Sequence, residues 1–248
     1  MEQSTAVEKA IDVLFHLHGS PEPQGVTAVG RALGLPKSSA HRLLGALGRR
    51  GLVERDGRGR YRPGIGLVAL GVGTLDREPV VEAARPVLEC EAEALGETLF
   101  LAAARAGRIH ILDKVEGPGF LRAAPRVGSL VPVGATAVGK LHLAFAPESV
   151  VEDAEGPAPR FTERTLGARA LAREVEAVRE RGWAANRDEW QPGLSAVAAP
   201  VFLGARLVAA VAAAAPSARL AEEDLPAVAD RVRDAAARVS ARLEGAAL

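Results

Sequence analysis

The sequence predicts an α+β fold in two domains: a small helical domain that ends in a β-hairpin, then a larger domain of mixed strands and helices. Three observations support this prediction. The chain has 248 residues, which suits two hydrophobic cores better than one. Apolar residues recur at helical spacing over the first 50 residues, whereas strand-like runs dominate several stretches after residue 96. A local excess of basic residues also separates the first domain from the rest.

The overall composition excludes several classes of protein. Charged residues make up 25% and hydrophobic residues 48%, as in ordinary globular proteins, and the 31 Lys and Arg balance the 31 Asp and Glu. The single cysteine, Cys90, excludes an internal disulfide and a multi-cysteine zinc site. There is no apolar run long enough to span a bilayer, and the charged N-terminus does not resemble a signal peptide. We therefore expect a soluble cytoplasmic protein with no membrane partner.

The first domain begins with two helices separated by a proline- and glycine-rich break. Residues 5–18 carry apolar side chains three and four positions apart, and Ser4 or Thr5 can cap this helix. The prolines and glycines of residues 19–25 end it. A second helix is predicted over 26–34, with Thr27 as its N-cap.

A third helix is predicted from about residue 36 to 50, starting at Pro36. It follows the second helix after a turn of about three residues, which is typical of a helix-turn-helix. Its apolar side chains fall on one face and its polar donors near the start on the other. A helix that enters the DNA major groove by its N-terminal end needs short donors and cations in its first turns. The donors here are Lys37, Ser38, Ser39, His41 and Arg42.

Residues 52–64 predict a β-hairpin, with a tight turn at Asp56-Gly57. Over residues 27–62, nine basic side chains face two acidic ones, a net charge of +7. A local basic block on a neutral chain is typical of a nucleic-acid-binding module. Helices followed by a basic hairpin indicate a winged helix-turn-helix that binds DNA; a solvated charged surface and a winged helix that contacts protein are the alternatives. The hairpin arginines suited to phosphate contact are Arg55, Arg58, Arg60 and Arg62.

The order of predicted strands and helices indicates that the second domain is an α+β sheet domain and not a doubly wound one. Two long amphipathic helices are predicted near its ends, and strands and shorter helices alternate between them. The predicted helices cover 79–95, 133–146, part of 162–182 and 225–243, and the predicted strands cover 97–104, 108–116, 120–124, 197–203 and 206–215.

We find no pattern that indicates catalysis, a metal or a cofactor. The tract Gly134 to Lys140 matches most of a phosphate-binding loop, but Leu141 stands where magnesium requires Ser or Thr. Gly193 precedes Ser195 as in a nucleophile elbow, but Val197 stands where the second glycine is required, so Ser195 is interpreted as an exposed strand residue. Cys90 is interpreted as a small buried residue. An enzyme fused to a DNA-binding head is the remote alternative.

Residues 4–71 closely resemble the N-terminal domain of the IclR family of bacterial transcriptional regulators. The tract LGLPKSSAHRLLGAL, residues 33–47, resembles the recognition-helix signature of that family. The resemblance implies that the five donors named above face DNA, and that a linking helix over 64–78 helps to form a dimer. The domains are then 1–63 for the winged helix-turn-helix, 64–78 for the linker and 79–248 for a GAF-like effector-binding domain. A dimer predicts a palindromic operator; a tetramer is also open.

Two tracts of the second domain also resemble this family. VPVGATAVGKLHLA, residues 131–144, is similar to the tract that opens the helix at the floor of the effector pocket, and residues 179–216 resemble the second family signature. The backbone amides at a helix start favour a carboxylate, and effectors of the family are often small organic acids. The resemblance implies the effector-binding residues Ala135, Thr136, Ala137, Val138, Asn186, Asp188, Ala196, Ala212 and Ala214.

Three of these positions depart from the family pattern. The frequent pocket cysteine falls on Ala196, and two positions that are often serine fall on Ala212 and Ala214. Alanine supplies no hydrogen-bond donor, so the effector is either a larger and more apolar metabolite, or the pocket has lost its ligand. A polar acid would need Thr136, Asn186 and the helix-start amides.

Overall fold

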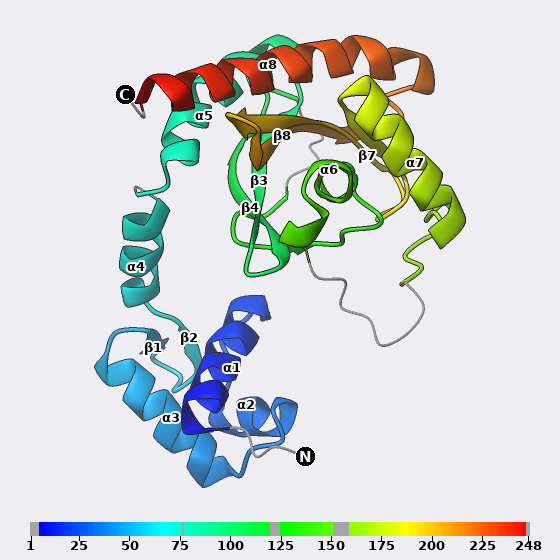
Figure 1. The fold of residues 1–248 in the computed structure, drawn as a ribbon. Helices are drawn as coiled ribbons and strands as arrows, with labels where there is room; N and C mark the ends of the chain where they lie inside the picture. Colours follow the sequence, from blue (N-terminus) through cyan, green and yellow to red (C-terminus); the bar gives the residue numbers. More distant parts are fainter. Residues whose placement is uncertain (1–4, 76, 120–124, 151–158, 247–248) are drawn as a thin grey trace. The chain divides into compact units, whose positions relative to one another are not determined.

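A computed structural model describes residues 5–75, 77–119, 125–150 and 159–246 (Figure 1). The chain divides into two compact units between Arg77 and Glu78. Each unit has its own hydrophobic core and is described by itself.

The N-terminal unit contains the predicted three helices and hairpin. The apolar stripes of the three helices meet the hairpin in one core, which includes Val13, Leu44 and Tyr61. Its elements are α1 (Ala6–Gly19), α2 (Val26–Ala32), α3 (Lys37–Arg49), β1 (Val53–Arg55), β2 (Tyr61–Pro63) and α4 (Ile65–Leu75).

The helix starts differ in detail from the prediction. Thr5 caps α1 as predicted and forms a reciprocal capping box with Glu8. The prediction that Thr27 caps α2 is wrong. The helix already begins at Val26, and Gly25 is its N-cap. Pro36 is likewise the N-cap of α3 rather than its first residue.

The hairpin turn is longer than predicted. Arg55 pairs with Tyr61, so five residues connect the strands instead of a tight Asp-Gly pair. The carboxylate of Asp56 organises this loop by accepting hydrogen bonds from the amides of Arg58 (2.9 Å) and Arg60 (2.8 Å). Gly59 adopts a φ of 78°, which only glycine accepts without strain.

The C-terminal unit is built on one antiparallel six-stranded sheet of order β5-β4-β3-β8-β7-β6. The strands β7 and β8 form its longest hairpin, and β3 pairs with β8 across the middle. The strands are β3 (Thr98–Arg105), β4 (Arg108–Val115), β5 (Leu130–Val131), β6 (Ala184–Arg187), β7 (Leu194–Leu203) and β8 (Arg206–Pro216).

Helices cover both faces of this sheet and give three layers (Figure 1). The helices α5 (Pro79–Leu95) and α8 (Leu225–Ala246) pack on one face, and α6 (Ala137–Phe145) and α7 (Ala168–Arg181) pack on the other. Alternate residues of the strands supply the two cores: Leu99 and Leu101 point to α5 and α8, whereas Phe100 and Ala102 point to the α6 side. Because both faces of the sheet are buried, the sequences of the central strands are continuous apolar runs.

Several predicted bounds of this unit change. Strands β5 and β6 were not predicted, and β7 starts three residues before the predicted residue 197. The helix α6 begins later than predicted, at Ala137, whereas α7 lies within the predicted range 162–182. The predicted strand 120–124 lies outside the described residues.

Candidate nucleic-acid interface and effector cavity

The first two turns of α3 present a polar face to solvent. Lys37, Ser38, His41 and Arg42 are exposed and Ser39 is half-buried. The opposite face of the helix packs into the core through Ala40, Leu44 and Leu47, as the sequence predicted. None of the three basic side chains forms an ion pair with a described residue, so their charge is available to an outside partner.

The arginines of the hairpin differ in whether their side chains are held by other side chains of the hairpin. Arg60 pairs with Asp56 at 3.2 Å and Arg62 pairs with Glu54 at 3.1 Å. Arg55 lies over the ring of Tyr61, with its guanidinium carbon 5.7 Å from the ring centre. Arg58 makes no ion pair within the described part of the chain, and it lies in the loop at the tip. The hairpin therefore holds three of its arginines in place and leaves Arg58 free.

The acidic residues of the hairpin are held ionised by their contacts. Hydrogen bonds from the backbone, chiefly that of Arg60, lower the pKa of Asp56. The amide of Ile65 is the main cause that lowers the pKa of Glu54, with a hydrogen bond from Arg62 second. These carboxylates brace the hairpin and connect it to the start of α4.

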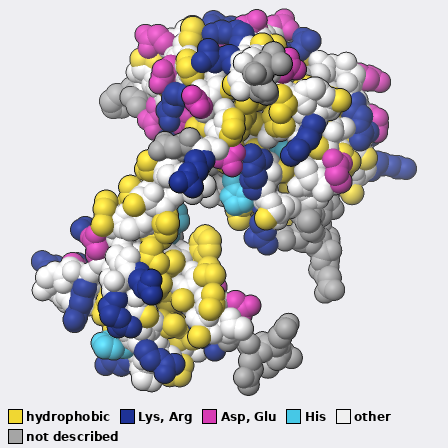
Figure 2. Space-filling model, turned by 60° about the vertical axis from the view of Figure 1, so that its left-hand side comes forward, with side chains coloured by type: hydrophobic (Ala, Val, Ile, Leu, Met, Phe, Trp, Pro, Cys, Tyr) yellow, Lys and Arg dark blue, Asp and Glu magenta, His cyan; other side chains and the backbone are white. Residues whose placement is uncertain are grey.

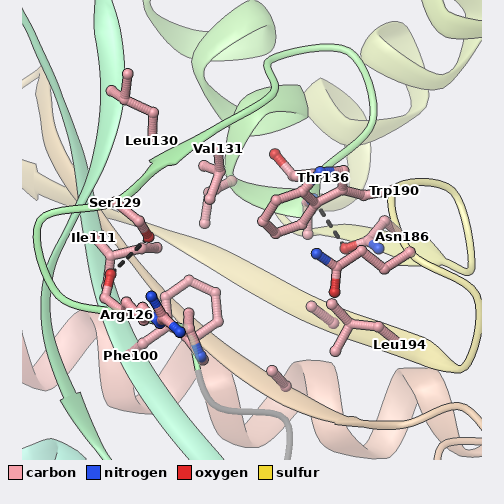
Figure 3. Close-up of a pocket in the computed structure, with 16 residues that line it drawn as sticks. Phe100, Ile111, Arg126, Ser129, Leu130, Val131, Thr136, Asn186, Trp190 and Leu194 are labelled. Carbon is pink, nitrogen blue, oxygen red and sulfur yellow. Dashed lines mark hydrogen bonds between the residues drawn. The ribbon is translucent and has the colours of Figure 1, made fainter. Parts of the chain in front are cut away.

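A cavity of about 340 Å³ lies in the C-terminal unit, between the sheet and the start of α6 (Figure 3). One side is formed by Arg126, Ser129, Phe100 and Ile111, and the other by Trp190, Asn186 and Leu194. The full lining is Phe100, Ile111, Pro125, Arg126, Ser129, Leu130, Val131, Thr136, Ala137, Val138, Asn186, Trp190, Gln191, Leu194, Ala196 and Ala214.

The start of α6 forms the polar end of the cavity. Thr136 caps this helix by accepting from the amide of Gly139 at 3.2 Å and donates its own proton to the carbonyl of Pro132 at 2.6 Å. Asn186 accepts from the amide of Ala137 at 3.3 Å, and its buried Nδ2 has no partner among the described residues. The helix dipole places positive potential here, so this end favours an acceptor or an anion.

Among the described residues, Arg126 is the one charged residue that lines the cavity. Its side chain makes no ion pair or hydrogen bond with a described residue, and none of the described lining residues is a carboxylate. Most other lining groups are aliphatic or aromatic. In the part of the chain that the structure describes, the lining thus combines a mostly apolar surface with one positive charge.

Six of the nine predicted effector residues meet in this cavity, and the other three do not line it. Ala196 and Ala214 lie directly opposite each other on β7 and β8, and both line the cavity. Ala212 and Ala135 are buried in the adjoining core. Asp188 holds the following loop instead. The six that line the cavity are Thr136, Ala137, Val138, Asn186, Ala196 and Ala214.

The geometry of Asp188 explains its place outside the cavity. Its backbone is left-handed, with a φ of 57°, which aspartate tolerates better than most residues. Its Oδ1 accepts from the amide of Gly193 at 2.7 Å and from the hydroxyl of Ser217 at 2.5 Å. These bonds close the loop between β6 and β7, which carries Trp190 into the cavity wall.

Two further predictions about reactive side chains are wrong. Ser195 is fully buried rather than exposed, and its hydroxyl lies 2.8 Å from that of Ser217. Cys90 is exposed on α5 rather than buried. Among the described residues, no three His, Cys, Asp or Glu side chains are grouped to hold a metal ion. No described helix combines the length and apolar character needed to cross a membrane.

Comparisons with known proteins agree over both units. Residues 6–57 match the IclR helix-turn-helix domain, and residues 72–241 match the C-terminal domain of bacterial transcriptional regulators of the IclR type. The glycerol operon regulatory protein of Streptomyces griseus is 34% identical over 240 residues, which cover 95% of this chain and 94% of that protein. The transcriptional regulator TtgV of Pseudomonas putida is 31% identical over 77% of this chain and 74% of its own.

Solved structures show the same fold. The Thermotoga maritima IclR protein superposes with a TM-score of 0.76 at 28% identity and covers 96% of this chain and 98% of its own. An IclR homologue from Microbacterium hydrocarbonoxydans, solved with 4-hydroxybenzoate, gives a TM-score of 0.81 at 22% identity, over 97% of this chain and all of its own. A DNA-binding N-terminal domain and an effector-binding C-terminal domain are thus both present, and the chain belongs to the IclR family of bacterial transcriptional regulators.

Proposed function

We propose that the regulator reads its operator with the first two turns of α3. Ser38, Ser39 and Arg42 are suited to base edges, because an arginine against guanine is the commonest specific contact.

Lys37 and His41 flank them, and Arg58 at the tip of the hairpin is suited to phosphate. Arg55 and Arg60 add charge nearby while they brace the hairpin. The free, exposed cations of α3 are the observation that supports this arrangement.

We also propose that the chain acts as a homodimer on a palindromic operator, with α4 as the linking helix. Large apolar side chains stand exposed on the N-terminal unit, where Figure 2 shows hydrophobic surface. A monomer rarely leaves so many exposed on two short helices, and a second copy would cover them. They are Val7, Ile11 and Phe15 on α1, and Ile65, Val68, Leu70 and Val72 on α4.

For the effector, we propose a small organic acid with an apolar, preferably aromatic, body. The observation that carries this proposal is the guanidinium of Arg126, the one charged group among the described residues of a largely apolar lining. A carboxylate at Arg126 would satisfy that charge without a competing acid, and the body would lie between Phe100 and Trp190. Acceptors at the far end of the ligand would meet Asn186 and the first amides of α6. We propose binding without turnover, in the cytoplasm.

Isothermal titration of the full chain tests the effector class. The probes are 4-hydroxybenzoate, benzoate and benzamide, of which the last is neutral but similar in shape to benzoate. We expect the acids to bind about tenfold more tightly than the amide, because a charge-assisted hydrogen bond is stronger than a neutral one. Arg126→Gln should remove that preference, whereas Arg169→Gln on the exposed surface of α7 should keep it.

Two outcomes would contradict this proposal. Equal binding of acid and amide by the parent chain would show that Arg126 does not select the ligand. No binding across these probes and a broad panel of acids and apolar metabolites would favour a DNA-binding regulator whose pocket has lost its ligand.

A further inference from the structure

A buried ion pair lies behind the cavity wall. Lys140 on α6 has 1% of its surface exposed, and its ammonium donates to Glu189 Oε1 and to the carbonyl of Ala185, both at 2.7 Å. Burial raises the pKa of Glu189, and the ammonium of Lys140 opposes that rise. Neither side chain lines the cavity. Removing two charges from water offsets much of their attraction, so stability alone is a weak reason for such a pair.

The ammonium of Lys140 and its two acceptors lie on three different segments, and each segment carries residues that line the cavity. Lys140 lies one turn after the α6 residues that line the polar end. Ala185 directly precedes Asn186, and Glu189 directly precedes Trp190, both of which line the cavity. The ammonium thus ties the helix start, the end of β6 and the following loop to a single point.

Other polar contacts hold the same loop from its outer side. The hydroxyls of Thr162 and Thr165 donate to the carbonyls of Asp188 and Glu189, each at 2.7 Å. Asp188 closes the loop through Gly193 and Ser217, as described above. These bonds leave Trp190 as the large side chain that the loop presents to the cavity.

We propose that Lys140 and Glu189 are positioning residues of the effector cavity: they hold Trp190 and Asn186 against the start of α6 without touching the ligand. The proposal rests on the proposed function of this cavity as the effector site. It assigns the pair a role in ligand affinity that is separate from its role in folding.

The fluorescence of Trp190 tests this proposal without any ligand. Trp183 is the other tryptophan, so a Trp183→Phe parent leaves Trp190 as the single reporter. The variant Lys140→Met/Glu189→Gln removes both charges and leaves no unpaired buried ion. We expect it to keep the melting temperature of the parent within a few degrees, but to raise acrylamide quenching of Trp190 roughly twofold as the loop loosens. Binding of 4-hydroxybenzoate should weaken about tenfold, as when supporting residues release a site.

A matched control lies on the other face of the sheet. Glu91 is a buried carboxylate paired with Arg231 and Arg238, each at 2.8 Å, between α5 and α8. Glu91→Gln should lower stability without changing the quenching of Trp190. A second test variant, Thr165→Val, removes one bond to the loop and adds no charge imbalance, so it stays informative if the double variant does not fold. It should raise quenching by a smaller amount.

Unchanged quenching of Trp190 in the folded double variant would overturn the proposal, whatever the result for Thr165→Val. If the parent binds no 4-hydroxybenzoate, the effector class proposed above fails, whereas the quenching result still decides whether this pair positions Trp190.

Discussion

His142 is buried on α6 with no oppositely charged partner among the described residues. Its Nδ1 lies 3.0 Å from the hydroxyl of Ser149, and burial lowers its pKa from 6.5 to about 4, with a further contribution from Arg105. Between pH 6.5 and 4 the unfolded chain therefore binds a proton that the folded chain does not. The free energy of unfolding should fall across this window as the pH falls, by about 3 kcal/mol from this residue.

Urea unfolding of the full chain at pH 7, 6, 5 and 4 measures that slope. His142→Leu should flatten it, because the variant has no imidazole to protonate. Ser149→Ala keeps the imidazole and should keep the slope. Equal slopes in His142→Leu and the parent would contradict the assignment.

We expect the cations of the N-terminal unit that form no ion pair with a described residue to make two kinds of DNA contact, one with bases and one with phosphates. Arg42→Ala should cost about 1–3 kcal/mol on the best operator and relax the preference at one base position. Arg58→Ala should instead weaken all sequences alike and reduce the slope of log affinity against log salt by about 1. Arg62→Ala is the control, because Arg62 is already paired with Glu54. Uniform weakening by Arg42→Ala across DNA sequences would contradict a base contact.

Among individual residues, the sequence predicted those cavity residues that lie in the two tracts that resemble the family. Thr136, Asn186, Ala196 and Ala214 were predicted together and lie in one cavity. It missed Arg126, whose place in the wall depends on how a turn packs against the sheet and not on any local spacing. The signal available in the sequence was an arginine four residues before Leu130, where the tract that leads to the pocket helix begins.

The helix α6 is the element whose first residues form the polar end of the cavity, so its exact position determines the shape of the cavity. A Cβ built on Gly139 would lie 1.9 Å from the carbonyl oxygen of Val133, and backbone atoms cannot move aside cheaply. Gly139→Ala should therefore lower the free energy of unfolding by about 3 kcal/mol, as overpacking does. Gly245→Ala on α8 is the control, because nothing lies within 4 Å of its added Cβ, and its effect should stay below about 1 kcal/mol.

Urea denaturation of the full chain, followed by circular dichroism, compares these two alanine variants. An effect of Gly139→Ala no larger than that of Gly245→Ala would show that α6 can shift away from the preceding turn. The close packing of the cavity floor would then have to be reconsidered.

The sequence predicted whether a segment is a helix or a strand where its apolar residues recur regularly. It did not predict the exact first and last residues of these elements. Both faces of β3 and β8 are buried, so their continuous apolar runs were visible in the sequence. β6 was missed because it has four residues, two of them polar or charged, and is a strand only because it pairs with β7. The hairpin turn was misjudged because Asp56 bonds to amides two and four residues ahead, which favours a longer loop than Asp-Gly alone suggests.

At the scale of the whole molecule, the exposed apolar faces of α1 and α4 predict assembly. Phe15→Glu together with Val68→Glu should shift the protein toward monomer in sedimentation velocity and weaken operator binding, because two linked DNA-binding units gain affinity from each other. Phe161→Glu, which changes an exposed phenylalanine of the C-terminal unit, is the control. A monomeric parent, or a double variant that sediments like the parent, would contradict dimer formation through this surface.

We propose that this chain is a dimeric regulator that reads a specific operator with α3. The most direct test is selection of binding sites from fragmented genomic DNA of the source organism by the purified full chain, with Arg42→Ala in parallel. The parent should enrich one inverted-repeat motif with half-sites spaced by whole helical turns, and Arg42→Ala should broaden the preference within each half-site. Enrichment of no motif, or of the same motif unchanged by Arg42→Ala, would contradict the account.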